Sequence, residues 1–473
     1  MTAVSTEPDA RYMTGLMQLG AGQTAAAIVT LREVLIRAPF HAAARRNLIR
    51  ALLAARDFEA VIAETSIALR HAPESAELHF LRGTACNALS RPEQAREALT
   101  TAIALNPNFA PAWLNLGNAL MDIDDLNAAE THCRRALELA PALIEAHVSL
   151  GFILTAQTRL PEAIATLEGA IRIEPENVHA HWNLATASLL AGDLPRGFKE
   201  YEWRKRHDLF RRDFINLPGR IWDGSDPNGQ TILVHAEQGF GDTIQFARYL
   251  PLIARRGGKP ILACDPSLIP LLKTIEGAQI VSKFDTLPHY DAWIDQMSLP
   301  HVFGTTSDTI PSAAGYLTAN PELIALHRAG LPPGKCVGLV WAGNPVHRND
   351  RRRTPPAEVF APLLAQNDWH FVSLVPYQTL PGIAQPARPL TDYAETAALI
   401  AAVDLVVTVD TSVAHVAGAL GRAAWVLLPY APDWRWRLDR DTTPWYDSLR
   451  LFRQPSPSDW RSVMATVGAA LAG

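Results

Sequence analysis

The sequence predicts an α + α/β protein, in which a helical solenoid is followed by a unit of two Rossmann-like parallel-sheet halves. Prolines recur every 34 residues in the first part of the chain, and short apolar strands alternate with helical segments in the second. The 473 residues correspond to about three globular units at roughly 100–200 residues each. We expect a repeat array at 8–211, a linker at 212–228, and sheet halves at 229–330 and 331–473.

The composition excludes several classes of protein. Hydrophobic residues make up 48% of the chain and the formal net charge is -5, which excludes disorder as the main state. The chain has a mild excess of acidic residues, so its overall charge does not indicate nucleic-acid binding. The four dispersed cysteines never form C-x-x-C, so neither a disulfide framework nor a zinc site is indicated. Because we find neither a signal peptide nor an apolar run that could span a bilayer, we expect a cytoplasmic protein.

Small residues and prolines mark the helical repeat. Small residues lie where two antiparallel helices approach closely, and a proline ends the second helix of each pair. The pattern resembles the tetratricopeptide repeat (TPR), with W-x-x-L-G at Trp113–Gly117, and about five to six repeats fill 8–211. That resemblance implies a superhelix whose groove binds extended peptides or helices of a partner. The recurring residues are Pro39, Pro73, Pro107, Pro141 and Pro175, with Gly83, Gly117, Gly151 and Ala185.

Asn47, Asn115 and Asn183 fall at the same position of the groove-facing helices. An asparagine amide can both donate to and accept from the backbone of an extended peptide. O-GlcNAc transferases hold peptides with such an asparagine ladder, so the resemblance implies an acceptor-peptide groove. Leu81 and Ser149 interrupt the ladder here, and the alternative is that asparagine is simply common at this repeat position.

From 229 onward, strands alternate with helices in two series, which predicts parallel sheets. The layout resembles that of GT-B glycosyltransferases, in which a terminal helix can cross back to the first half. Ligands of open α/β sheets lie at the carboxyl ends of the strands, so the turns that follow the strands are candidate sites. The predicted strands are 231–236, 260–264, 278–281 and 292–294, then 336–341, 369–375, 405–409 and 424–428, and the last predicted helix is near 459–471.

The turn Gln238–Thr243 directly follows a predicted strand and begins a helix. Gly239 and Gly241 allow a tight turn and a close approach of the backbone to a ligand. The same residues fit an ordinary helix start, with Asp242 as N-cap and Gln245 as its capping-box partner. The motif G-x-G-D-x-I is similar to that of heptosyltransferase-like enzymes, and this resemblance implies that Asp242 is the catalytic base in an interdomain cleft.

A second turn, at 409–415, also follows a strand and begins a helix. Its N–H groups and positive dipole end can bind phosphate, and Thr411 and Ser412 add hydroxyl donors. The alternative is capping by Asp410 and a histidine satisfied in the core. The run is similar to the D-[ST]-G-x-x-H-x-A donor-site motif of the same superfamily, although Ser412 replaces the glycine. The resemblance implies that Asp410 and Thr411 bind the donor and that His415 orients a phosphate or a sugar hydroxyl.

The densest positive cluster, at 341–353, follows the first strand of the second half. Guanidinium groups bind diphosphate in a bidentate manner, so we predict that this loop binds the donor. No lysine occurs beyond the start of this strand, so arginine would replace the lysine that many GT-B enzymes place on the leaving phosphate. A solvated basic loop is the alternative. The candidate residues are Asn344, Arg348, Arg351 and Arg353.

Trp434 and Trp436 lie in a loop after the last predicted strand. Exposed aromatic rings beside arginine suit stacking on a nucleotide base or a sugar face, and ordinary loop packing is the alternative. A D-x-D at Asp439–Asp441 lacks the fold context of metal-dependent glycosyltransferases, and we expect no metal and no cofactor.

Together the motifs resemble those of bacterial TPR glycosyltransferases, some of which modify flagellin or other proteins. The resemblance implies metal-independent transfer of a sugar from a nucleotide sugar to a hydroxyl of a protein acceptor that the TPR groove recruits. Asp242 would take the proton, and Arg351 and Arg353, with the N–H groups of the turn at 411–412, would stabilise the departing phosphate. Two alternatives remain: a TPR adaptor with a degenerate transferase unit, or a transferase acting on a glycan or a lipid-linked acceptor.

Overall fold

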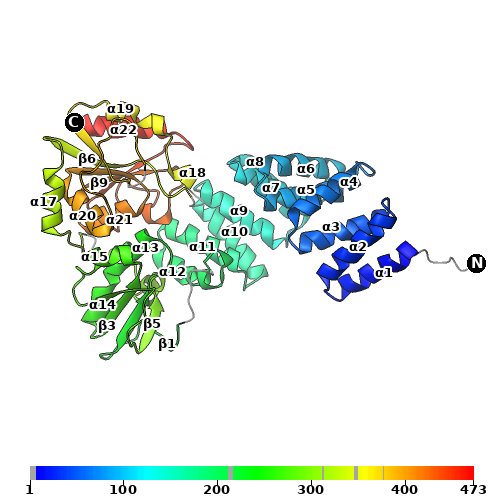
Figure 1. Cartoon of the computed structure of the whole chain (residues 1–473), viewed down its shortest axis with the longest axis horizontal. Coiled ribbons are helices and arrows are strands. Elements are labelled where there is room, and N and C mark those ends of the chain that lie inside the picture. Colours follow the sequence, from blue (N-terminus) through cyan, green and yellow to red (C-terminus); the bar gives the residue numbers. More distant parts are fainter. Residues whose placement is uncertain (1–6, 211–216, 312–313, 346–349, 376–377, 473) are drawn as a thin grey trace, which may run out of the picture. The chain divides into compact units, whose positions relative to one another are not determined.

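The computed structural model describes residues 7–210, 217–311, 314–345, 350–375 and 378–472. The chain divides into two compact units, Met1–Ala180 and His181–Gly473 (Figure 1). This boundary lies within a helix and not in the predicted linker, so the end of the predicted repeat array belongs to the second unit. None of the described helices is long and apolar enough to cross a bilayer.

Twelve described helices precede the sheets and form six consecutive pairs, which confirms the helical repeat (Figure 1). Short 3-10 helices, η1 (Glu202–Arg206) and η2 (Asp208–Phe210), follow the last pair. The pairs are α1 (Glu7–Gly20) and α2 (Thr24–Arg37), α3 (Ala42–Ala54) and α4 (Phe58–Leu69), α5 (Ala76–Ala88) and α6 (Pro92–Leu105), α7 (Ala110–Asp122) and α8 (Leu126–Leu139), α9 (Ile144–Ala156) and α10 (Leu160–Ile173), and α11 (Val178–Ala191) and α12 (Leu194–Tyr201).

Close packing within the pairs explains the small residues of the repeat. A Cβ atom on Gly83 would lie 2.4 Å from Leu99 Cγ, and one on Gly151 would lie 2.4 Å from Leu167 Cγ. The optimal separation of two carbon atoms is about 3.5–4.0 Å, so any side chain at these positions would force the two helices apart. The predicted close approach of the helices is confirmed at these positions.

The repeating prolines also provide a hydrogen-bond acceptor. A carbonyl in a turn between helices has no partner in either helix, and here the side chain six residues later supplies one. Guanidinium, imidazole and indole N–H groups therefore serve the same purpose in successive repeats. The pairs are Arg45 Nη2 with Pro39 O, His79 Nε2 with Pro73 O, Trp113 Nε1 with Pro107 O, and His147 Nε2 with Pro141 O, at 2.8–2.9 Å.

The turn inside each helix pair needs one residue in the left-handed backbone region. Only glycine adopts this region without steric cost, and yet four of the six positions carry another residue. The sequence pattern did not predict this feature, because no single residue type repeats there. The positions, again 34 residues apart, are Gly22, Arg56, Ser90, Asp124, Thr158 and Gly192, with φ between 55° and 92°.

The first sheet has five parallel strands in the order β1-β5-β2-β3-β4. Four strands confirm the sequence prediction, whereas β1 and the buried Trp222 lie in the segment predicted as a linker. A two-residue strand shows no periodicity, so only its pairing with β5 reveals it. The strands are β1 (Arg220–Ile221), β2 (Thr231–His235), β3 (Lys259–Cys264), β4 (Gln279–Ser282) and β5 (Ala292–Asp295).

Consecutive residues of β2 and β3, which point to opposite faces of the sheet, are buried. Both faces of the first sheet are therefore covered, as is usual for a parallel sheet. The α-helices of this half are α13 (Phe240–Phe246), α14 (Leu250–Arg255), α15 (Ile269–Leu272) and α16 (Leu299–Val302), whereas the next helix, α17 (Pro321–Ala329), packs against α20 (Tyr393–Ala402) of the second half. Its 3-10 helices are η3 (Ala247–Tyr249), η4 (Pro266–Leu268), η5 (Gln296–Ser298) and η6 (Ser307–Thr309).

The second sheet is also parallel, in the order β10-β9-β8-β6-β7. The edge strand β10, which pairs with β9, was not among the predicted strands. The strands are β6 (Lys335–Val340), β7 (Trp369–Ser373), β8 (Leu405–Val409), β9 (Ala424–Leu428) and β10 (Leu449–Arg453). The helices are α18 (Asp350–Arg353), η7 (Ala357–Phe360), α19 (Ala361–Leu364), α20 (Tyr393–Ala402), α21 (Ser412–Ala419), η8 (Trp434–Trp436) and α22 (Trp460–Ala472).

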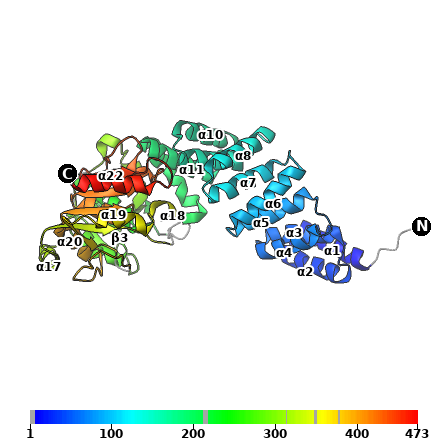
Figure 2. The same ribbon diagram turned by 90° about the horizontal axis from the view of Figure 1, so that it is seen from above.

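The terminal helix α22 lies alongside α19 and packs against β10 (Figure 2). Two hydrogen bonds fix it: Gln366 Nε2 donates to Gly468 O at 3.0 Å, and Trp369 Nε1 donates to Leu471 O at 3.2 Å. Both donors belong to the second half. The structure therefore places this helix on the second sheet, where the resemblance allowed it to cross back to the first.

Helix α12 is an integral part of the second unit. Its buried Phe198 makes edge-to-face contacts with Phe246, which follows β2, and with Trp434 and Trp445, which follow β9. One aromatic side chain thus contacts residues of both sheet halves. The end of the predicted repeat array therefore supports the region between the two sheets.

Candidate functional site

The two predicted turns each follow the central strand of a sheet, and they meet. Helix α13 follows β2, α21 follows β8, and the two helices contact each other. A Cβ atom on Gly241 would lie only 2.8 Å from His415 Cδ2, so no residue larger than glycine fits there without displacement. The structure thus brings together two motifs that lie far apart in the sequence.

Asp242 lies in the first turn of α13, next to Gly241, the residue at which α13 meets α21. Its Oδ2 accepts a hydrogen bond from Gly239 N at 2.9 Å, so Gly239 is the N-cap, and the prediction that Asp242 is the N-cap was wrong. Its Oδ1 accepts a hydrogen bond from Arg435. Burial raises the pKa of Asp242, and the nearby Arg435 guanidinium opposes that rise.

Arg435, in the loop after β9, is a site residue that the sequence analysis did not identify. Its side chain is 8% exposed and donates to three acceptors: Nη2 to Asp242, Nη1 to Asp433 at 2.9 Å, and Nε to Gln245. Its guanidinium carbon also lies 4.2 Å from the centre of the Trp434 ring. The sequence indicated that this loop, which is rich in arginine and tryptophan, could bind a ligand. No local feature of the sequence indicated which of its arginines reaches the site.

Asp410 and Thr411 precede α21. Thr411 is the N-cap, and its hydroxyl oxygen accepts a hydrogen bond from Val413 N at 3.3 Å. Burial and the charge of Asp433 raise the pKa of Asp410 to about 6, while Arg353 opposes the rise. Arg353 also donates from Nη1 to Asp410 O at 2.9 Å, which places a guanidinium next to the start of the helix.

Ser412 and His415 have partners within the protein. The Ser412 hydroxyl lies 2.7 Å from the Tyr393 hydroxyl. His415 is buried, its Nδ1 lies 3.0 Å from the Tyr446 hydroxyl, and its ring stacks on Trp436 at 5.5 Å. Burial, together with the nearby Arg435, lowers the pKa of His415 far below its usual value, so its imidazole is neutral at pH 7.

The basic loop reaches this site through Arg353. A Cβ atom on Gly343 would lie 2.6 Å from Arg353 Nη2, so the glycine makes room for this guanidinium. Arg351 and Asn344 are exposed to solvent. Arg348 lies outside the described residues.

Trp434 and Trp436 are not exposed, which contradicts their predicted role as stacking platforms. Their residues are 4% and 0% exposed, because α12, Trp445 and His415 cover the two rings. They form part of the wall that supports the site. The loop-packing alternative is therefore correct for these two residues.

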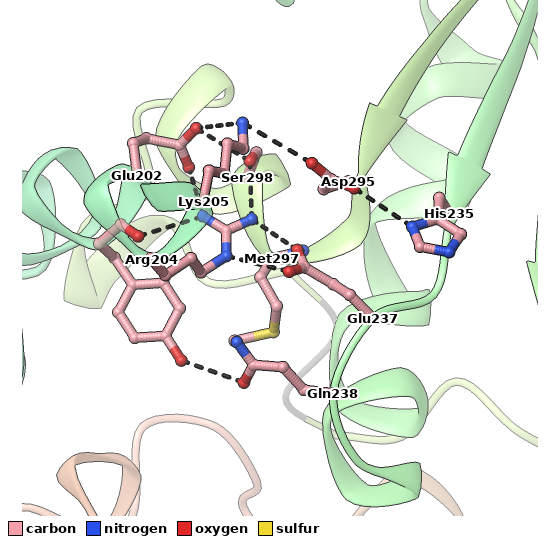
Figure 3. A network of polar contacts seen from close by, with 10 residues as sticks. Glu202, Arg204, Lys205, His235, Glu237, Gln238, Asp295, Met297 and Ser298 are labelled. Carbon is pink, nitrogen blue, oxygen red and sulfur yellow. Dashed lines mark hydrogen bonds and ion pairs between the residues drawn. The ribbon is translucent and has the colours of Figure 1, made fainter. Parts of the chain in front are cut away.

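A second polar cluster, which no sequence motif indicated, lies at the carboxyl ends of β2 and β5 (Figure 3). Arg204, from η1, is fully buried, and it donates from Nε to Glu237 Oε2 at 3.1 Å and from Nη2 to Ser298 Oγ at 2.9 Å. The Tyr201 hydroxyl donates to Gln238 Oε1 at 3.2 Å. Because Glu237 immediately precedes the turn that carries Asp242 and Gln238 begins it, the cluster ties that turn to the end of the helical array.

The predicted ladder asparagines have contacts within the protein. Asn47 Nδ2 donates to the Tyr12 hydroxyl at 2.9 Å, and Asn115 Nδ2 donates to Thr84 Oγ1 at 2.8 Å. All three ladder side chains, including Asn183, are partly exposed. An acceptor-peptide groove along them stays a prediction.

Among the described residues, no three His, Cys, Asp or Glu side chains are grouped so as to hold a metal ion. The acidic side chains at the junction of α13 and α21 alternate with arginines instead, as in the run from Asp242 through Arg435 to Asp433. This arrangement favours hydrogen bonding and charge stabilisation of a polar ligand.

Comparison with known proteins gives matches to both parts of the chain. The tetratricopeptide repeat family matches residues 12–65, 88–144 and 153–202, and Glycosyltransferase family 9 (heptosyltransferase) matches residues 387–454. Protein FlbA of Caulobacter vibrioides is 28% identical over 422 residues, which are 81% of this chain and 70% of FlbA. Protein O-mannosyl-transferase TMTC3 of Homo sapiens is 27% identical over 172 residues, 36% of this chain and 18% of TMTC3.

Solved structures of TPR proteins match part of the chain. TTC0263, a thermophilic TPR protein in Thermus thermophilus, has 22% sequence identity and a TM-score of 0.33, and the match covers 38% of this chain and 99% of that chain. The glycosyltransferase match includes Asp410, Thr411, His415 and Arg435, whereas Asp242 lies outside it. The two family matches and the similarity to FlbA show tetratricopeptide repeats together with a glycosyltransferase family 9 segment, which supports a TPR-glycosyltransferase protein.

Proposed function

We propose that the chain transfers a sugar from a nucleotide-sugar donor to an acceptor hydroxyl where α13 and α21 meet. The observation that carries this proposal is the contact of the two turns, which sets the Asp242 carboxylate beside the residues of the matched glycosyltransferase segment. We also propose that the two sheets are the two halves of a GT-B unit. In such sheets ligands lie at the carboxyl ends of the strands, where both turns are found.

Asp242 acts as the general base. It accepts the proton of the acceptor hydroxyl while the acceptor oxygen bonds to the anomeric carbon of the donor sugar. The bond from that carbon to the diphosphate oxygen breaks, and the nucleoside diphosphate leaves with the bonding electron pair. Burial raises the pKa of Asp242, so its carboxylate is a stronger base than an exposed aspartate.

Arg353 and the N-terminus of α21 stabilise the leaving diphosphate. Arg353 donates a hydrogen bond to the backbone oxygen of Asp410, immediately before α21. A guanidinium therefore lies next to the positive end of the helix dipole. Arg351, on the same short helix, is exposed and able to approach the donor. Because these groups supply positive charge, the reaction needs no metal, and a chelator should leave the turnover unchanged.

The TPR array recruits a protein acceptor, and a flagellin-like protein is one such candidate. Repeat arrays present an extended surface that suits an elongated segment of a partner. The asparagine ladder at Asn47, Asn115 and Asn183 would hold that segment once the present contacts of these side chains, such as those of Asn47 and Asn115, are exchanged for bonds to the partner. We place this reaction in the cytoplasm.

The donor can be identified with the full chain and a panel of UDP-, GDP-, ADP- and CMP-sugars. At one hundred times its dissociation constant, a ligand stabilises its binding unit by about 2.7 kcal/mol, which a thermal-shift assay detects. The responding sugar is then tested for transfer to the acceptor or to water. Asp242→Asn should lower the turnover by roughly 10²–10⁴-fold while the donor still binds.

Asp285→Asn is the matched control, because it makes the same chemical change at an exposed aspartate of the same sheet half. Its turnover should equal that of the unaltered chain. If no nucleotide sugar shifts the melting temperature, the chain is an adaptor and the proposal fails. If a donor binds but only a glycan or a lipid-linked acceptor is modified, the acceptor class is wrong and the chemistry stands.

A further inference from the structure

We infer that Arg435 is the positioning residue for Asp242, so that the half of the unit that contains the glycosyltransferase segment orients the base carried by the other half. This inference rests on the proposed function. Three observations lead to it: the engagement of every guanidinium nitrogen of Arg435, the position of its loop, and the small number of other contacts that hold Asp242.

Arg435 is fixed on all sides within the protein. Its Nε, Nη1 and Nη2 donate to Gln245, Asp433 and Asp242, and its guanidinium lies over the Trp434 ring. A planar guanidinium held at all three nitrogens cannot rotate without breaking several charge-assisted hydrogen bonds. It therefore holds Asp242 Oδ1 in one orientation.

The contact joins elements that are separate in the sequence. Arg435 is in η8, after β9 of the second sheet, whereas Asp242 and Gln245 are in α13, after β2 of the first sheet. Arg435 thus contacts two residues of α13 that lie one turn apart, and its bond to Asp433 anchors it to its own loop. A change in the arrangement of the two halves would withdraw the guanidinium from the base.

The other contacts of Asp242 do not fix it equally well. The hydrogen bond from Gly239 N holds Oδ2 within the same helix turn and is present in any arrangement of the halves. Among the described residues, the ionisable groups that act most strongly on Asp242 are Arg435 and Asp433, from the loop after β9, and Tyr201, from α12, also acts on it. His415, from α21, packs against the neighbouring Gly241. Arg435 is the cation of this group, because the pKa of His415 is far below its usual value.

The positioning role and a donor-binding role predict different kinetics. If Arg435 orients and charges Asp242, Arg435→Met lowers kcat by at least tenfold and moves the acid limb of the rate-against-pH profile to higher pH. The limb moves up because the carboxylate loses its cation while it stays buried, so its pKa rises. The donor dissociation constant, measured by thermal shift, stays within twofold. Arg435→Lys keeps the positive charge. It should move the acid limb part of the way back toward that of the unaltered chain, but it should not restore the full kcat.

The matched control is Arg440→Met, which removes an exposed arginine from the same loop and should change neither kcat nor the pH profile. A readout without turnover is the double-mutant cycle of Asp242→Asn and Arg435→Met in urea unfolding. We expect the two effects to be non-additive by about tenfold in the unfolding equilibrium constant, which corresponds to about 1.4 kcal/mol.

The possible outcomes separate the two proposals. Additive effects in the unfolding cycle overturn the contact and with it the positioning role. A weaker donor affinity with an unchanged pH profile also overturns it, because Arg435 would then be a donor ligand. If the effects are non-additive but the chain transfers no sugar, the ion pair exists. The absence of transfer then contradicts both the proposed function and the positioning role. Non-additivity together with a shifted acid limb and an unchanged donor affinity supports the inference.

Discussion

Gly241→Ala tests the contact of the two turns, on which the candidate site depends. The new Cβ atom would lie 2.8 Å from His415 Cδ2 and 3.4 Å from Nε2, and His415 cannot retreat because Trp436 and Tyr446 hold its ring. Overpacking of this kind costs about 1–3 kcal/mol. Alanine in a helix gains up to about 1 kcal/mol over glycine. The cost of overpacking exceeds the gain in helix propensity, so we expect the free energy of unfolding to fall by about 1–2 kcal/mol.

A loss of this size is measurable as a change in melting temperature. For units of 150–250 residues, 1 kcal/mol corresponds to about 2–4 °C, and less for larger ones, so we expect the larger second unit to melt a few degrees lower at most. Transfer activity should fall more steeply, because a displacement of α13 moves Asp242 away from the donor residues. Circular dichroism melts and turnover assays on the same preparation measure both effects.

Gly468→Ala is the control for the loss of glycine in a helix of the same unit. Its Cβ atom would meet only the flexible end of Gln366, at 3.2 Å, so the stability should not fall and should rise by up to about 1 kcal/mol. His415→Ala should cost less in the Gly241→Ala background than alone, because it removes the atoms that clash. A Gly241→Ala chain with unchanged melting and turnover would refute the contact between α13 and α21.

Three further predictions follow from buried polar contacts. Arg204→Met should cost about 3–5 kcal/mol in urea unfolding, because it leaves the Glu237 carboxyl buried without its cation, whereas the double change with Glu237→Leu should cost much less; equal costs would contradict the buried pair. His147→Phe should lose about 1 kcal/mol, because a proline carbonyl loses its donor, while His147→Trp should retain the stability, since Trp113 makes the same bond in its own repeat. Asp410→Asn should be more stable than the unaltered chain at pH 7.5 and equal to it below pH 4. The pKa of Asp410 is raised to about 6, above about 3.9 in the unfolded chain, so the stability that its protonated form provides is lost as the pH rises through 6; a pH-independent difference would contradict this.

The repeat array shows how much a local pattern determines. The 34-residue spacing of the prolines and small residues predicted the helix pairs, because each repeated residue acts on its immediate surroundings. A glycine leaves room for Leu99 or Leu167 of the paired helix, and a proline lies in the turn between two helices. The strands of both sheets were predictable for the same reason, since apolar runs between turn residues are a local signal. The exceptions were β1, with two residues, and β10, at an edge.

The candidate site was predictable only in part. Asp242, Asp410 and His415 follow strands, so the sequence indicated that they lie at the carboxyl ends of sheets, and the structure brings their turns together. The burial of Trp436 was not predictable, because the residues that cover it come from other elements. A loop sequence rich in arginine and tryptophan looks the same whether the tryptophan faces solvent or the core.

The sequence by itself thus determined which elements form, and which turns can carry chemistry. The tertiary structure decided the partners: Arg435 for Asp242, 193 residues apart, and Arg204 for Glu237, 33 residues apart. Helix and strand periodicity depends on neighbours a few residues away, whereas an ion pair forms only where packing brings two distant side chains together and removes the water between them.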